Sequence, residues 1–266
     1  RYWGAPLPVW FEEEAKKKYV IESVEELKKH TKKSGNKFFV MRHGEGEHNV
    51  LDMCSSNKDN PHHLTDLGIE HVKTSSEFLK DKNIDVIIRS PFVRTKETTK
   101  IICDQLDFNE DNVIEDDRIA EFNFGDFNLR PFEEYLSYRQ GHEYDMDYII
   151  PGGESLQQAK NRFAEFFYDI EKRFEGKNIL VVTHGIGFQV IPSIINGAKK
   201  EESGHILRNK FKKIPDACIE EFEFVPLSHN ADYELDLHLP YIDRVDLVDN
   251  GEKLVRTKEV FDCWFE

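Results

Sequence analysis

Short apolar runs alternate with segments of helical periodicity along the chain, and this alternation most limits the folds that it can adopt. The runs 37–41 and 178–182 are typical of buried β-strands. Apolar residues recur at helical spacing over 67–80 and 155–174. Because strands that alternate with helices form mainly parallel sheets covered on both faces, the sequence predicts an α/β fold of three layers.

Polar residues predict where two of the helices begin. Thr65 stands where its side chain can cap the helix that follows it. After a β-branched run at 84–88, Ser90 and Pro91 indicate a second helix start, with Ser90 as the N-cap and Pro91 in the first turn. We therefore expect helices to begin near residues 66 and 91.

Three polar side chains come soon after the ends of predicted strands. His43 follows the first run, His184 follows the run at 178–182, and Arg94 lies in the first turn after the run at 84–88. The carboxyl ends of parallel strands meet at one edge of a sheet, where ligands bind. The sequence thus predicts that these three side chains share one crevice.

The composition excludes some classes of protein. Acidic residues outnumber basic ones by 51 to 36, a balance unsuited to binding a nucleic acid duplex, although a few arginines can still form a local phosphate pocket. The four cysteines lack C-x-x-C spacing, which argues against a zinc ribbon or a disulfide framework and favours the cytoplasm. No apolar run approaches the length of a membrane span, so we expect no membrane partner.

The residues in the predicted crevice match the needs of phosphate monoester cleavage. Arg42 and Arg94 can donate paired, charged hydrogen bonds to phosphoryl oxygens. His43 can attack as a neutral imidazole if its other ring nitrogen donates to a backbone carbonyl. His184 can act as a further donor to the charge that develops in the transition state.

Two glycines and one acid complete this hypothesis. We expect Gly44 and Gly185 to let the backbone approach a ligand closely. Glu121 can protonate the leaving group, and later accept a proton from the hydrolytic water. Burial beside Phe122 and Phe124 would raise the pKa of Glu121 and keep it protonated.

Six segments in order resemble the histidine phosphatase superfamily, the phosphoglycerate mutase-like proteins, over roughly 36–223. One R-H-G tripeptide is a weak signal, but six ordered matches are a strong one. They are Arg42-His43-Gly44-Glu45 with Asn49, Leu64-Thr65-x-x-Gly68, Ser90-Pro91-x-x-Arg94-Thr95-x-Glu97-Thr98, Glu121 with Phe124-Gly125, Pro151-Gly152-Gly153-Glu154-Ser155, and Val182-Thr183-His184-Gly185.

The resemblance implies a phosphoglycerate mutase-like fold, a phosphorylated small-molecule substrate and neither metal nor cofactor. It implies that His43 accepts the phosphoryl group and Glu121 donates the proton. It also implies a set of phosphate-binding residues, namely Arg42, Asn49, Arg94, His184 and Gly185. A metal site at His62 and His63 is not expected, because no cysteine or third histidine stands at ligand spacing. We expect those two and His48 to be exposed loop residues.

Departures from the family pattern bear on the reaction. Residues 122–128 carry no positive charge where the mutases have a basic and aromatic run that holds a second acidic group. Hydrolysis is therefore expected rather than mutase chemistry. Two alternatives stay open, a phosphoglycerate mutase and a non-catalytic domain that binds a phosphorylated ligand or a tRNA end.

The flanks resemble a different family. Residues 1–10 and 21–27 are similar to the catalytic domain of isoleucyl-tRNA synthetase, and 236–243 and 259–265 look like the same domain resuming. The simplest interpretation is a phosphatase domain inserted into a synthetase, with both ends cut from a longer chain. tRNA would then be a partner only through the parent protein, because the nucleotide-binding motifs of that synthetase do not occur here.

This interpretation divides the chain into three segments, of which the first and the last together form one small subdomain. The expected boundaries are 1–35 and 226–266 for the synthetase segments, which would form the subdomain together, and 36–225 for the phosphatase domain. Trp3 and Trp10 are expected to pack within the synthetase segments rather than stack on bases.

Overall fold

The structure is a computed structural model that describes residues 9–11, 18–20, 23–210 and 214–256. The chain forms two compact units. One spans 34–224, and the other combines 1–33 with 225–266. Trp3, the side chain of Trp10 and the segments 1–8 and 259–265 lie outside what the structure describes. The predicted packing of the two tryptophans therefore stays a prediction.

The larger unit is built on a five-stranded sheet in the order β5-β4-β6-β3-β7. The strands β5, β4, β6 and β3 run parallel, and β7 pairs antiparallel with β3 at one edge. This arrangement confirms the mainly parallel sheet. The strands are β3 (Lys37–Arg42), β4 (Val86–Arg89), β5 (Ile114–Glu115), β6 (Asn178–Thr183) and β7 (Ile219–Phe222).

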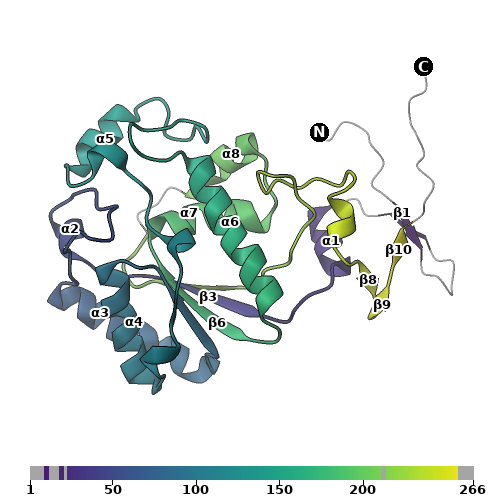
Figure 1. The fold of residues 1–266 in the computed structure, drawn as a ribbon, viewed down its shortest axis with the longest axis horizontal. Helices are drawn as coiled ribbons and strands as arrows, with labels where there is room; N and C mark the ends of the chain where they lie inside the picture. The colour runs from purple at the N-terminus through teal and green to yellow at the C-terminus, as the bar shows by residue number, and fades with distance from the viewer. Residues whose placement is uncertain (1–8, 12–17, 21–22, 211–213, 257–266) are drawn as a thin grey trace. The chain divides into compact units, whose positions relative to one another are not determined.

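Helices cover both faces of this sheet (Figure 1). Alternate strand residues such as Phe39 and Leu180 join a core with α3 (Asp66–Ser76) and α4 (Val93–Leu106). On the opposite face, Phe38 packs edge-on against Phe167 of α6, with ring centroids 5.3 Å apart. Because successive side chains on a strand point to opposite faces, this alternation produces the three predicted layers.

The larger unit contains further helices besides α3 and α4. The helix α6 packs against α7, the helix that begins directly after His184. Short 3-10 helices occur at 77–82, 110–112, 117–119 and 125–127. The α-helices are α2 (Glu47–Val50), α5 (Phe132–Tyr138), α6 (Leu156–Arg173), α7 (Gly185–Ile195) and α8 (Lys200–Lys210).

One of the two predicted helix starts is confirmed and the other is wrong. The Thr65 hydroxyl caps α3 by accepting a hydrogen bond from the backbone nitrogen of Gly68. The helix α4 begins later than predicted, after Phe92, and Phe92 makes no side-chain cap. The Ser90 hydroxyl is instead bonded to His184.

Segments from both ends of the chain form the smaller unit. A small core contains Leu27 and Leu247, one from each segment. β1 pairs with both β2 and β10 in an antiparallel sheet, and β8 with β9 forms a hairpin. The elements are β1 (Val9–Phe11), β2 (Lys18–Val20), α1 (Val24–His30), a 3-10 helix (Ile242–Arg244), β8 (Val248–Asp249), β9 (Glu252–Lys253) and β10 (Val255–Arg256).

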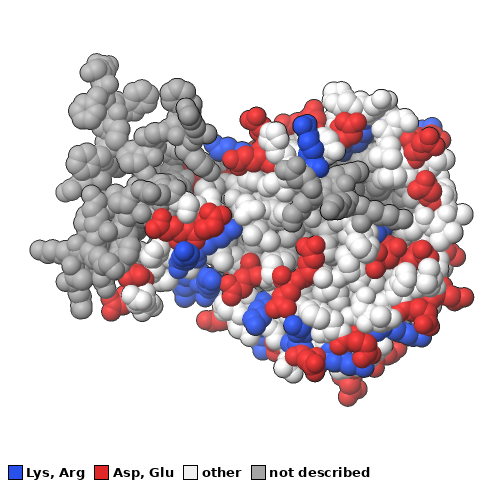
Figure 2. Space-filling view, turned by 180° about the vertical axis from the view of Figure 1, so that it is seen from behind, with Lys and Arg blue, Asp and Glu red and all other residues white. Residues whose placement is uncertain are grey.

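The described surface fits the acidic composition. On the face in Figure 2, acidic and basic side chains are interspersed, and the part drawn in colour shows no broad basic patch. Among the described residues, no helix combines the length and apolar character needed to cross a membrane.

Candidate active site

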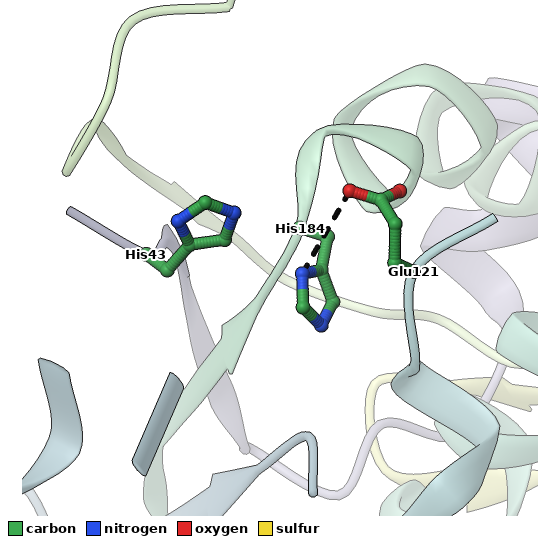
Figure 3. A group of neighbouring side chains, drawn as sticks. All are labelled: His43, Glu121 and His184. Atoms are coloured by element: carbon green, nitrogen blue, oxygen red, sulfur yellow. Dashed lines mark ion pairs between the residues drawn. The ribbon is translucent and has the colours of Figure 1, made fainter. Parts of the chain in front are cut away.

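Two buried histidines stand side by side at the carboxyl edge of the sheet. His43 follows β3 and His184 follows β6, and these neighbouring strands pair in parallel up to Arg42 and Thr183. The two imidazole centroids are 5.2 Å apart. Glu121 points toward them from a separate loop (Figure 3). The structure therefore brings together the residues that the sequence placed in one crevice.

Hydrogen bonds hold the His43 ring in one orientation. Its Nδ1 lies 2.7 Å from the carbonyl oxygen of Gly44, and its Nε2 lies 3.1 Å from Nε of Arg94. A carbonyl can only accept and a guanidinium can only donate, so the proton belongs on Nδ1 and the lone pair on Nε2. Burial, and next the charges of Arg94 and Arg42, hold the pKa of His43 well below its usual value. The ring is thus neutral, as the sequence analysis expected of a nucleophile.

Arg94 is almost fully enclosed, with 1% of its surface exposed. Its Nη2 donates to the carbonyl oxygen of Ser55 at 3.0 Å, and its guanidinium stacks 4.6 Å from the centroid of the Phe92 ring. Burial lowers the pKa of Arg94 to about 10, which still leaves it charged at neutral pH. A buried cation with few acidic neighbours is a strong attractor for an anion.

The guanidinium of Arg42 has partners at Nη1, whereas its Nε has none among the described residues. Its Nη1 donates to the carbonyl oxygen of Ile214 and lies 2.8 Å from Oδ1 of Asp216. Its Nε is buried and has no hydrogen-bond partner among the described residues. A methyl group added to Gly185 would come within 3.9 Å of this nitrogen, so the backbone of Gly185 and the free Nε line the same space.

His184 also has one occupied and one unoccupied nitrogen. Its Nε2 lies 2.8 Å from the Ser90 hydroxyl, whereas no described atom forms a hydrogen bond with its buried Nδ1. Burial, and next the charge of Arg94, lower the pKa of His184 well below the usual value. The helix α7 starts here without a side-chain cap, which leaves its first N–H groups for an anion.

The surroundings of Glu121 differ from the prediction. Phe122 and Phe124 pack against each other, with centroids 5.3 Å apart, and against Tyr135. The carboxylate instead faces His184 Nδ1 at 3.7 Å and Arg94 Nη2 at 3.9 Å, with 14% of the side chain exposed. The predicted apolar shell is wrong, because the adjacent aromatic rings fill their own cluster.

Asn49 and Gly44 have structural contacts of their own. The Asn49 side-chain oxygen accepts a 3.0 Å hydrogen bond from the backbone nitrogen of Gly46 at the start of α2. Its amide nitrogen is therefore the group left for a phosphate. A methyl group on Gly44 would lie 2.6 Å from the carbonyl oxygen of Gly68 and 2.7 Å from Val72 Cγ2. Gly44 thus allows close packing on α3, and the expectation that its backbone approaches a ligand stays a prediction.

A third histidine, His48, belongs to this cluster, and the expectation that it is an exposed loop residue is wrong. It is only 6% exposed, and its ring lies 5.5 Å from His43 and 5.7 Å from the half-buried His62. Burial, and next the charge of Arg94, lower the pKa of His48 to about 2. The short helix α2 folds His48 back over the site, which local polarity could not reveal. His63 is exposed as expected and pairs with Glu97.

The cluster could geometrically hold a metal, but its electrostatics favour an anion. Ligand atoms of His43, Glu121 and His184 all lie within 4.8 Å of one another. Two guanidiniums, those of Arg42 and Arg94, stand beside them, and Arg94 donates to the very nitrogen of His43 that faces the site. A cation placed there would be repelled by both charges.

A cavity of about 520 Å³ adjoins the site at Glu121 and Phe92. It is mainly polar, and its carboxylates outnumber its cations. Its other charged and amide side chains are those of Asn57, Lys58, Asp117, Asn123, Asp126, Asn128, Glu154 and Arg162.

Neutral histidines, converging guanidiniums and a free helix N-terminus at the edge of a parallel α/β sheet define a phosphoryl-transfer site. The model of the histidine phosphatase superfamily (branch 1) matches residues 38–224, and the chain belongs to this family.

Relatives within this family include phosphatases and mutases. The chain is 28% identical over 201 residues to the uncharacterized phosphatase PhoE of Bacillus subtilis, covering 75% of this chain and 95% of that protein. It is also 28% identical to a 2,3-bisphosphoglycerate-dependent phosphoglycerate mutase of Parvibaculum lavamentivorans, over 56% of this chain and 75% of that one. Among solved structures, Bacillus stearothermophilus YhfR shares the fold, with a TM-score of 0.60, 20% identity and coverage of 85% of this chain and 98% of that chain.

Proposed function

We propose that this protein hydrolyses phosphate monoesters without a metal ion, through a phosphohistidine formed at His43. One observation carries the proposal. The Nε2 lone pair of a neutral His43 lies in a buried space that Arg94, the free Nε of Arg42 and the free Nδ1 of His184 border. Unpartnered donors around an aligned nucleophile are what a phosphoryl group requires.

In the first step, Nε2 of His43 attacks the phosphorus atom as the bond to the leaving oxygen breaks. Arg42, Arg94, His184 and the N-terminus of α7 hold the three other phosphoryl oxygens. The leaving oxygen takes a proton from the carboxylic acid of Glu121 and departs as an alcohol. Before attack, Arg94 must release its hydrogen bond to His43 and donate to the phosphoryl oxygens instead.

In the second step, water attacks the phosphorus atom of the phosphohistidine. The carboxylate of Glu121 now accepts a proton from this water, and the phosphorus–nitrogen bond breaks. Inorganic phosphate leaves, while neutral His43 and protonated Glu121 are restored. Proton count and charge balance over the cycle.

Hydrolysis fits the site better than mutase chemistry. A mutase must hold the phosphorylated intermediate through a second anionic group, and residues 122–128 offer no cation for it. The adjoining cavity contains Arg162, but its guanidinium is already taken by Glu154 and by backbone carbonyls. This leaves Lys58 as the cation there that could meet an anionic substrate group.

We also propose that this domain is an insertion in a cytoplasmic isoleucyl-tRNA synthetase. The likeness of the flanking segments to that enzyme supports the proposal. So does the compact unit that 1–33 and 225–266 form together, because a guest domain leaves the two flanks of its host close in space. Any contact with tRNA would then belong to the parent protein. Aminoacylation by the full-length protein, with loss of activity on deleting its synthetase motifs, is the test.

The phosphatase proposal is tested with p-nitrophenyl phosphate and with a radiolabelled phosphodonor. We expect turnover in the presence of a chelator, and an acid-labile label on the protein. His43→Ala should lose both, whereas His63→Ala, a change of the same kind at an exposed histidine, should keep both. Full turnover in His43→Ala, or activity that disappears with the chelator, would refute the proposal. Saturable binding of phosphate without any phosphoenzyme would indicate a non-catalytic binding domain.

A further inference from the structure

We propose that Glu154 and Arg162 act as a positioning pair that aims the carboxyl group of Glu121 at the leaving oxygen. The inference rests on the proposed function, because it assigns these two residues to the proton-transfer step of that reaction. Neither residue reaches the phosphoryl pocket. Both act through the backbone of the loop that carries Glu121.

The side chain of Glu121 has little to hold it in place. Its one hydrogen bond among the described residues comes from the backbone nitrogen of Phe122, at 2.8 Å to Oε1. Its Oε2 is 3.7 Å from His184 Nδ1 and 3.9 Å from Arg94 Nη2, both beyond hydrogen-bond distance. The direction of the carboxyl group is therefore determined by the backbone at 121.

Arg162 anchors that backbone from the helix α6. Its Nη1 donates to the carbonyl oxygens of Arg118 at 2.8 Å and Ala120 at 2.7 Å, and its Nη2 donates to the carbonyl oxygen of Glu121 at 3.0 Å. Its remaining N–H groups bind Glu154 at 3.0 and 2.8 Å. A guanidinium has five N–H groups, so every donor of Arg162 is in use.

Glu154 anchors the other side of the same loop. The oxygen that binds Nη2 of Arg162 also accepts a hydrogen bond from the backbone nitrogen of Asn123 at 2.8 Å. The backbone nitrogen of Glu154 donates to the carbonyl oxygen of Asn123 at 3.1 Å. Backbone groups at 118, 120, 121 and 123 are thus tied to one ion pair, which is 20% exposed at Arg162 and 13% at Glu154.

The loop is also tied to the strand that carries His184. The Thr183 hydroxyl donates to the carbonyl oxygen of Ile119 at 2.7 Å, and Thr183 directly precedes His184. The ion pair and Thr183 together hold Glu121 at a constant place relative to the phosphoryl pocket. Without the ion pair, the loop keeps the Thr183 tie but loses the contacts on both sides of Glu121.

The test compares two substrates whose leaving groups differ in their need for a proton. This comparison separates proton donation from the other parts of catalysis. A nitrophenolate leaves without a proton, whereas an alkyl alcohol needs one. We expect Arg162→Gln and Glu154→Gln to lower kcat/KM for an alkyl phosphate such as glycerol phosphate by about 10²-fold, as a misplaced catalytic group does. For p-nitrophenyl phosphate, kcat/KM should change by less than about tenfold, because only the phosphohistidine-forming step enters this constant.

Controls decide whether the loss acts through Glu121. Glu121→Gln should show the same selective loss, and the double variant Glu121→Gln with Arg162→Gln should lose no more than Glu121→Gln alone. Arg173→Gln, the same change at an exposed position of the same helix, should behave like the wild type. Glu154→Gln keeps the acceptor oxygen, which guards against loss of the fold.

The outcomes are distinct from those for the proposed function. An equal fall for both substrates in Arg162→Gln and Glu154→Gln, while Glu121→Gln remains selective, would overturn the positioning role and leave the phosphatase intact. Losses that add in the double variant would also overturn it. Absence of a phosphoenzyme in the wild type would instead overturn the proposed function itself.

Discussion

Nε of Arg94 donates a hydrogen bond to Nε2 of His43 across 3.1 Å. The nitrogen that would attack phosphorus is thus already in contact with the cation that would bind the phosphoryl group. This contact orients the ring and, by its charge, helps to keep the imidazole neutral. The same guanidinium would gain a better partner when a phosphate dianion arrives, because oxygen anions accept stronger hydrogen bonds than a neutral imidazole.

Arg94→Lys should therefore lower kcat by about 10²–10³-fold, the usual effect of removing one donor to a developing anion. Lysine keeps a charge but cannot bind both the imidazole and the phosphoryl oxygens with a planar fork. Steady-state kinetics with p-nitrophenyl phosphate would measure this. The matched change Arg89→Lys, at a surface ion pair with Glu110, should leave kcat within a factor of about two. Equal losses in the two variants would contradict the assignment.

Alanine at two of the glycines should affect two different properties, stability at Gly44 and activity at Gly185. Gly44→Ala should lower the free energy of unfolding by about 1–3 kcal/mol, because the new methyl group would meet the carbonyl oxygen of Gly68 at 2.6 Å. Gly185→Ala should leave stability nearly unchanged, but lower kcat/KM roughly tenfold as its methyl group enters the space beside Arg42 Nε. Urea unfolding and kinetics measure the two effects. A destabilised Gly185→Ala with normal kinetics would show that this backbone does not border the ligand.

Asn49 offers a way to separate capping from phosphate binding. Asn49→Asp keeps an oxygen for the backbone nitrogen of Gly46, so the free energy of unfolding should change by less than about 0.5 kcal/mol. It replaces the amide nitrogen with a negative oxygen, and we expect KM for the phosphate ester to rise about tenfold by repulsion of the dianion. An unchanged KM would restrict Asn49 to its capping contact.

Stability should depend on pH through the buried imidazoles. The pKa values of His43, His48 and His184 are all lowered from 6.5, so the unfolded chain binds protons that the folded protein does not. Their contribution to stability is complete above about pH 6.5 and is lost as the pH falls below it, by up to ~1.4 kcal/mol per pH unit for each imidazole.

Urea unfolding measured between about pH 5 and pH 7 would test this dependence. His48→Gln should reduce the slope of the unfolding free energy against pH by the contribution of one imidazole, which is up to ~1.4 kcal/mol per pH unit. The slope should be unaffected in His205→Gln, which makes the same change at an exposed position. If His48→Gln keeps the full slope, His48 does not titrate as its burial implies.

Local patterns predicted the elements that position the site. The strands before His43 and His184 and the cap at Thr65 were recognisable because burial of a strand and capping of a helix depend on neighbouring residues. The late start of α4 was not recognisable, because the hydroxyl of Ser90 binds His184, which is 94 residues away. A residue that suits a cap locally can thus have a better partner elsewhere in the fold.

The surroundings of the site residues were less accessible to sequence reasoning. His48 looked like a polar loop residue, yet the turn into α2 buries it against His43. Glu121 was expected among its neighbouring aromatic rings, but it faces Arg94 and His184. In both cases the deciding neighbour comes from the three-dimensional path of a loop, which apolar periodicity does not encode.

The sequence by itself determined the layered α/β fold and the gathering of His43, His184 and Arg94 at one edge of its sheet. Local periodicity shows where the strands end, and the carboxyl ends of parallel strands meet at one edge of a sheet. Only the tertiary structure decided the protonation of His43, the free nitrogens of Arg42 and His184, and the ties that hold the loop of Glu121. These depend on burial and on hydrogen bonds between distant residues, since the electrostatics of a group arise from everything packed around it.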